Sequence, residues 1–148
     1  MPKGFKLSPQ LRDTVRKRAN YLCEYCHALE AWQYVEFTME HLTPLADGGE
    51  STLDNLALAC FACNRRKWDR RVGIDAETGK EYRLFNPRID NWRDHFVWAS
   101  NKVEIVGLTP IGRATINALE MNRDRAKQIR AADLDVGRHP PPSDKVLE

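Results

Sequence analysis

The chain has 148 residues, 42% of them hydrophobic, and this length predicts one domain with a modest core. It contains no window near the ~20 apolar residues of a membrane span and no signal-peptide-like start, so we expect a cytoplasmic protein with no membrane partner. The net charge is only +2, but basic residues collect in runs at 16–18, 65–67 and 70–71.

The first half of the chain predicts a helix, two strands and a second helix. A helix begins near Ser8, which is followed by a proline suited to the first helical position. β-Branched and aromatic residues within 32–42 predict a strand, and a glycine-containing loop follows at 44–50. The apolar run 56–59 predicts a second strand, and 64–68 contains good helix formers. The order is therefore strand, loop, strand, helix.

The second half is less regular in pattern. Residues 73–81 are rich in turn formers and predict a connection without a strand. Apolar residues in 103–106 predict another strand, and a helix is expected from 109 toward 131. The proline-rich segment 137–148 predicts a disordered tail.

Four cysteines stand in two pairs of identical spacing, Cys23 with Cys26 and Cys60 with Cys63. A two-residue spacer lets both sulfurs of a pair face one tetrahedral ion, so we expect a structural zinc site. Disulfides or a redox pair are the alternatives, which a reducing compartment disfavours. The 33 residues between Cys26 and Cys60 exceed the ~15–20 of a simple zinc ribbon, so further structure is inserted there.

The basic runs have two interpretations. Taken alone, such runs are usually solvated helix faces. Because these runs lie beside the cysteine pairs in the sequence, we favour a surface for a phosphate-bearing partner.

Several short motifs occur in a fixed order between the first cysteine and Lys67. They are Glu40-His41, Gly48-Gly49, Leu53-Asp54-Asn55-Leu56 and Asn64 directly after the last cysteine. With the cysteine pairs, this segment resembles an HNH endonuclease of the zinc-knuckle type. The resemblance implies a small α+β domain built on a ββα-metal finger that cleaves nucleic acid. We expect one domain over 1–136, with the finger core at 21–70, a packed strand and helical extension at 71–136, and the tail beyond it.

The resemblance also assigns roles within the finger. His41 takes the position of the general base, and Glu40 and Asn64 take the two ligand positions for a catalytic cation. Their oxygens suit Mg²⁺ or Mn²⁺. Asn55 takes the position that ties down the loop between the strands and so aims the base. Glu40 stands where Asp is frequent, and Asn64 stands where the family name implies His.

Each of these residues also has a plainer interpretation. His41 and Glu40 fit an exposed strand, Asn55 fits a turn, and Asn64 fits a helix cap. Their joint occurrence at matching offsets favours catalysis.

Double-stranded DNA is the expected partner, bound by a monomer or weak dimer. The predicted contacts to nucleic acid are Arg65, Arg66, Lys67, Arg88 and His95, where basic side chains follow the finger or lie among aromatic residues. For His95, packing and a place near the active site are equally favoured. The competing functions are a zinc-knuckle module that binds nucleic acid without cutting it and a disulfide-stapled interaction domain.

Overall fold

The computed structural model describes residues 7–148 and divides the chain into two units. The first contains the chain up to Arg65 together with Asn86–Ile89. The second contains Arg66–Phe85 and Asp90–Glu148. Both units combine short helices with two-stranded antiparallel pairings, which confirms the predicted α+β class.

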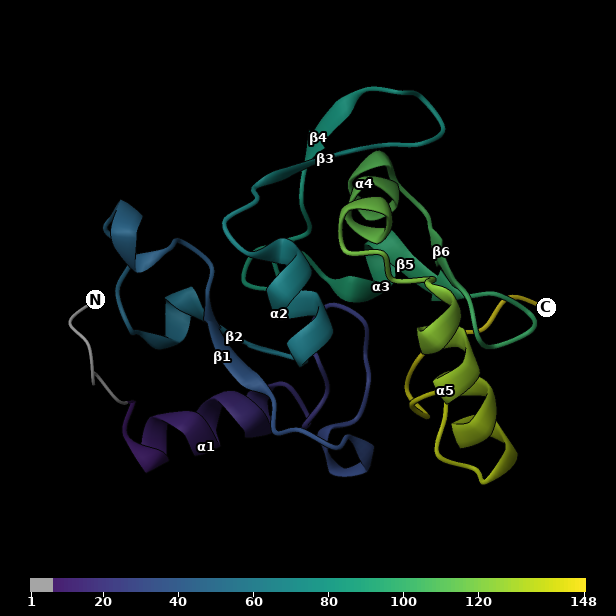
Figure 1. Ribbon diagram of the computed structural model, residues 1–148, viewed down its shortest axis with the longest axis horizontal. Coiled ribbons are helices and arrows are strands. Elements are labelled where there is room, and N and C mark those ends of the chain that lie inside the picture. The colour runs from purple at the N-terminus through teal and green to yellow at the C-terminus, as the bar shows by residue number, and fades with distance from the viewer. Residues whose placement is uncertain (1–6) are drawn as a thin grey trace. The chain divides into compact units, whose positions relative to one another are not determined.

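The first unit is built on helix α1, one strand pair and most of helix α2 (Figure 1). Helix α1, Pro9–Arg18, begins where the sequence predicts it, because Ser8 Oγ accepts a hydrogen bond from the Leu11 amide at 3.1 Å. Strands β1, Thr38–His41, and β2, Leu56–Ala59, pair antiparallel with His41 opposite Leu56. All four residues of β2 are buried, which explains its continuous apolar run. Helix α2, Phe61–Lys67, follows at once.

The strand predicted within 32–42 is shorter than its sequence suggests. Only Thr38–His41 is extended and paired, while Glu30–Trp32 forms a single 3₁₀ turn. The Glu30 carboxylate accepts hydrogen bonds from the Phe37 amide at 2.9 Å and from the Arg16 guanidinium at 2.9 and 3.1 Å. These contacts hold the intervening residues as a loop, although their composition favours a strand.

Residues 86–89 belong to the first unit through Arg88. Its guanidinium forms an ion pair with Glu24 and donates to the Leu56 carbonyl at 3.2 Å. Arg18, at the end of α1, donates to the carbonyls of Leu53 and Leu56 at 2.7 and 2.5 Å. Two arginines from distant parts of the sequence therefore fix the backbone on either side of Asn55.

The second unit contains two antiparallel strand pairs, one short helix and two longer helices. Its elements are β3 Val72–Ile74, β4 Glu81–Arg83, α3 Trp92–His95, β5 Phe96–Trp98, β6 Ile105–Gly107, α4 Pro110–Ala118 and α5 Asp124–Asp135. Strand β3 pairs with β4, and β5 pairs with β6. A Cβ atom added at Gly73 would lie 2.7 Å from the Ala114 carbonyl oxygen, so glycine lets β3 approach α4 closely. None of the described helices combines the length and apolarity needed to cross a membrane.

Two predictions for this unit differ from the structure. The segment 73–81, predicted as a connection, contributes to both strands of the β3–β4 hairpin. The helix predicted from 109 toward 131 is two helices, because Glu120 adopts a left-handed backbone with φ of 48°. The side chain of Asn122 then bonds the amide and carbonyl of Ile105, each at 2.8 Å, and so joins the break to β6.

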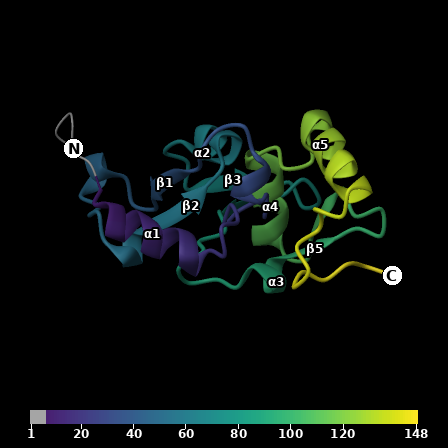
Figure 2. The same ribbon diagram turned by 90° about the horizontal axis from the view of Figure 1, so that it is seen from below.

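The tail at 137–148, predicted to be disordered, is ordered along β5 (Figure 2). The Trp98 amide donates to the Lys145 carbonyl at 3.1 Å, and the Leu147 amide donates to the Trp98 carbonyl at 2.8 Å. The Trp98 indole donates to Asp144 at 3.0 Å. Hydrogen bonding to a strand edge orders this segment without the apolar pattern of a strand.

A buried carboxylate organises the β3–β4 turn. Asp75 has no exposed surface, and its oxygens accept hydrogen bonds from the Glu77 amide at 3.0 Å and the Thr78 hydroxyl at 2.9 Å. The guanidinium of Arg113, on α4, binds both carboxylate oxygens at 2.9 and 3.0 Å. Arg113 and the turn donors hold the pKa of Asp75 well below its usual range.

We expect Asp75→Asn to lower the thermal unfolding midpoint by roughly 5 °C or more, because it removes the charge that Arg113 pairs with. The folded-state pKa is lowered, so the Asp75 contribution is present above the unfolded-state pKa of about 3.9 and is lost as pH falls toward the folded-state value. Calorimetry at neutral pH tests this effect. Glu77→Gln is the matched control, since Glu77 also meets Arg113, at 3.2 Å, but is exposed. Equal midpoints for Asp75→Asn and wild type would contradict the expectation.

Candidate metal centre and active site

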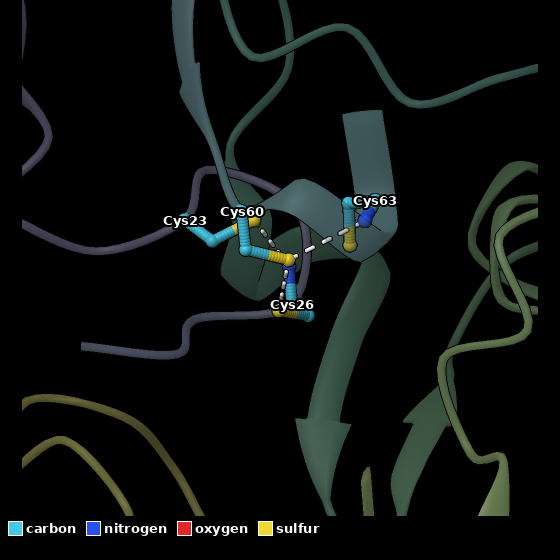
Figure 3. A group of neighbouring side chains, drawn as sticks. All are labelled: Cys23, Cys26, Cys60 and Cys63. Atoms are coloured by element: carbon cyan, nitrogen blue, oxygen red, sulfur yellow. Dashed lines mark hydrogen bonds between the residues drawn. The ribbon is translucent and has the colours of Figure 1, made fainter. Parts of the chain in front are cut away.

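The four cysteine side chains converge on one point (Figure 3). Cys23 and Cys26 come from the loop after α1, Cys60 follows β2, and Cys63 lies in α2. All four are buried and their sulfurs lie within 4.8 Å of one another. The Cys26 and Cys60 sulfurs are 3.7 Å apart, close to the about 3.8 Å expected between two ligands of a tetrahedral ion with 2.3 Å metal–sulfur bonds.

The surroundings of these sulfurs suit a bound cation. The Cys26 amide approaches the Cys23 sulfur at 3.5 Å, and the Cys63 amide approaches the Cys60 sulfur at 3.4 Å. Burial raises the pKa of the Cys23 thiol well above its usual range, so a thiolate at this position needs a compensating cation. The described residues contain four free cysteines. The cluster is a metal-binding arrangement, and four buried sulfurs at these separations fit a structural zinc ion.

Glu40 is a buried carboxylate at the centre of the strand pair. It lies in β1 opposite Ala57, and only 5% of its surface is exposed. The Tyr25 hydroxyl donates a hydrogen bond to its Oε1 atom at 3.1 Å. Asn64 lies in the first turn of α2, where its backbone amide donates a hydrogen bond to the Cys60 carbonyl at 2.9 Å. A carboxylate oxygen and a side-chain amide oxygen are both ligand types that Mg²⁺ or Mn²⁺ accepts, and the joint role of Glu40 and Asn64 as ligands stays a prediction.

His41 ends β1 and is half-buried. Its Nε2 atom lies 2.9 Å from the Ser51 hydroxyl oxygen. Burial lowers the pKa of His41 below 6.5, so the imidazole is neutral at physiological pH. The side chain therefore has the protonation state that a general base requires.

Asn55 fixes the loop between the two strands. Its Oδ1 atom accepts from the Thr43 amide at 2.8 Å, and its Nδ2 atom donates to the carbonyls of Thr43 at 3.0 Å and Glu50 at 2.8 Å. Gly49 completes this packing, since a Cβ there would lie 1.8 Å from the Thr43 carbonyl oxygen. The loop that carries Ser51 to His41 is thus held at both ends by one side chain.

The three predicted nucleic-acid contacts in α2 differ in exposure. Arg65 is exposed. Arg66 forms an ion pair with Glu120 at 3.1 Å, and Lys67 is buried, with 6% of its surface exposed. Of these three side chains, Arg65 therefore offers the most accessible charge to a phosphate.

Arg88 and His95 take part in packing within their own units. Arg88 is held by Glu24 in the first unit. In the second unit, His95 Nδ1 lies 2.6 Å from the Thr109 hydroxyl, and its ring meets Phe85 edge-on at 5.8 Å. These contacts account for the placement of both side chains, and their roles in binding nucleic acid stay predictions.

Two residues that contact Glu40 and His41 could not be predicted from sequence patterns. Tyr25 occupies a spacer position of the first cysteine pair, and an aromatic residue there indicates packing alone. Ser51 lies in a polar loop, where serine is common. Each meets its partner, Glu40 or His41, only through the fold.

A comparison with protein families matches residues 23–70 to the model described as HNH endonuclease. The matched segment contains the four cysteines and the four predicted active-site residues. A comparison with curated protein sequences finds no match. Residues 23–70 thus carry the HNH motif on a ββα unit with a four-cysteine metal centre, as the resemblance implied.

Proposed function

We propose that the HNH endonuclease domain at residues 23–70 hydrolyses DNA phosphodiester bonds with one catalytic divalent cation. The observation that carries the proposal is the contact between His41 and a hydroxyl group. His41 Nε2 lies 2.9 Å from Ser51 Oγ, which is the type of contact a general base makes with the water that it activates.

The residues of the finger have separate proposed roles in the reaction. A neutral His41 accepts the proton of the attacking water at Nε2, and Ser51 Oγ marks a position from which an oxygen reaches this atom. Asn55 holds the loop and so keeps the imidazole aimed. Glu40 and Asn64 would hold the cation, and the bound cation would supply stabilisation of the charge that develops on the phosphate and the leaving oxygen.

This ligand set predicts weak binding of the cation before DNA arrives. Glu40 supplies one negative charge, and the Asn64 amide oxygen supplies none. Mg²⁺ at a site with so few protein oxygens would keep several waters until substrate phosphate arrives. The catalytic cation is therefore expected to exchange readily, whereas the zinc ion does not.

Double-stranded DNA is the proposed substrate, and Arg65 is the most exposed of the three predicted contacts Arg65, Arg66 and Lys67. One finger supplies one catalytic centre. A dimer could therefore cut both strands together, whereas a monomer needs two successive cuts. Nicked circles are therefore the expected first product on a plasmid.

Incubation of supercoiled plasmid with zinc-loaded protein tests the proposal. Mg²⁺ or Mn²⁺ is expected to give nicked circles, and EDTA is expected to prevent their formation. Retarded but intact plasmid under all of these conditions would instead identify a module that binds DNA without cutting it.

The pH dependence of cleavage follows from the burial of His41. The base acts only when neutral, and burial lowers its pKa, so activity is retained down to a pH below about 6.5 and is lost on further acidification. Single-turnover rates at saturating Mn²⁺, measured from pH 5 to 8, give the midpoint of this loss. A midpoint well above 6.5 would contradict the assignment, provided the circular dichroism spectrum is constant over the range.

A further inference from the structure

The spacer of the first cysteine pair contains a tyrosine with a polar partner in the active site. Tyr25 stands between Cys23 and Cys26 and has no exposed surface. Its hydroxyl donates to Glu40 Oε1 at 3.1 Å, across 15 residues of sequence. A zinc knuckle needs only two residues of spacer length, so nothing in the zinc chemistry requires a phenol here.

The neighbouring spacer residue fixes the position of this phenol. The Glu24 amide donates to the Leu58 carbonyl at 2.8 Å, and Glu24 Oε2 accepts from the Leu58 amide at 2.7 Å. Leu58 lies in β2, next to Ala57, which pairs with Glu40. The knuckle is thus bonded to β2 through Glu24 and to β1 through Tyr25.

A hydroxyl donor changes what a buried carboxylate does. A buried glutamate side chain can adopt several rotamers, and burial removes much of the hydration of its carboxylate. The hydrogen bond from Tyr25 to Oε1 selects one of these rotamers and so fixes the direction in which the carboxylate points. Groups that hydrogen-bond a ligating carboxylate typically contribute ~10–100-fold to metal affinity or activity.

We propose that Tyr25 is a positioning residue for the catalytic cation and that it links the zinc knuckle to the active site through Glu40. The inference rests on the proposed role of Glu40 as a ligand of that cation. The zinc ion holds Cys23 and Cys26, these cysteines hold the phenol between them, and the phenol orients the carboxylate. The structural zinc thereby supports binding of the catalytic cation at Glu40, although zinc itself is bound only by the four cysteines.

Tyr25→Phe tests the link, because it removes the hydroxyl and keeps the buried ring. Mn²⁺ binding to the zinc-loaded protein, followed by electron paramagnetic resonance without DNA, is expected to weaken ~10–100-fold. The Mn²⁺ concentration for half-maximal plasmid cleavage is expected to rise in parallel, and excess Mn²⁺ restores the rate. Tyr34→Phe is the matched control, since Tyr34 is fully exposed, and it is expected to behave as wild type.

A double-mutant cycle separates positioning from a general structural effect. If Tyr25 acts through Glu40, adding Tyr25→Phe to Glu40→Gln causes no further loss of Mn²⁺ affinity. Zinc content is measured for each variant. If Tyr25→Phe is less stable than wild type, the comparison between the single and double variants still shows whether its effect on Mn²⁺ affinity depends on Glu40. Wild-type Mn²⁺ affinity in Tyr25→Phe, or a further loss in the double variant, would overturn the inference.

Failure of the inference is distinct from failure of the proposed function. Wild-type protein that cuts DNA, with a Tyr25→Phe variant of unchanged metal dependence, overturns the role of Tyr25 alone. Wild-type protein whose Mn²⁺ binding depends on both Glu40 and Tyr25, but which cuts no DNA, supports the link and contradicts the proposed nuclease activity.

Discussion

Cys26→Ser is expected to abolish zinc binding and to unfold the finger. The buried sulfurs of all four cysteines lie within 4.8 Å of one another, and a single ion replaces the contacts that a larger core would supply. Structural zinc typically contributes ~10–16 kcal/mol to the folding of small zinc-binding peptides, more than a domain of this size holds in reserve. Zinc analysis and near-ultraviolet circular dichroism measure the two losses, and DNA cleavage is expected to disappear with them.

Ala62→Ser is the matched control for this substitution. Ala62 lies in the spacer between Cys60 and Cys63, so the same hydroxyl enters the knuckle without replacing a ligand. One zinc ion per chain and a wild-type spectrum are expected. A Cys26→Ser protein that kept its zinc and its spectrum would contradict the four-cysteine centre.

His41→Ala is expected to reduce the cleavage rate ~10²–10⁴-fold, the usual contribution of a general base. Zinc content and the thermal midpoint are expected to stay near wild type. His41 is half-buried at the end of β1 and is not part of the four-cysteine cluster. Single-turnover cleavage of a labelled duplex at saturating Mn²⁺ gives the rate. Binding of the same duplex, measured with EDTA present, is expected to be unchanged.

His139→Ala provides the comparison for His41→Ala. Its imidazole lies 2.6 Å from the Lys102 carbonyl oxygen in the second unit. Wild-type cleavage by His139→Ala shows that loss of an imidazole as such has no effect. Equal rates for His41→Ala and wild type would remove His41 from the mechanism.

Local patterns predicted the parts of the fold that depend on few long-range contacts. Ser8 and Pro9 give the start of α1, and the apolar run 56–59 matches the bounds of β2. The family match at 23–70 and the clustered cysteines confirm the zinc-knuckle HNH resemblance, because this motif is compact in sequence. The chemical roles of Glu40, His41, Asn55 and Asn64 stay proposals.

The features that the sequence did not predict depend on contacts between distant residues. β1 is shortened by the bonds of Glu30 to Arg16 and Phe37. The tail is ordered by its hydrogen bonds to Trp98, which lies 46 residues before Asp144. The hydrogen bond from Tyr25 to Glu40 joins two residues that each have an ordinary local explanation. Periodicity and spacing carry no information on such pairs.

The most direct test of hydrolysis follows the oxygen atom of the water that His41 is proposed to activate. Zinc-loaded wild-type protein cleaves a short DNA duplex with Mg²⁺ in water labelled with heavy oxygen, and mass spectrometry identifies the products. We expect one labelled oxygen per cut, in the terminal phosphate of one new end, with an unlabelled hydroxyl at the other new end, and no product when Mg²⁺ is chelated. An intact duplex, or cleaved ends without the label, would contradict hydrolysis by this finger.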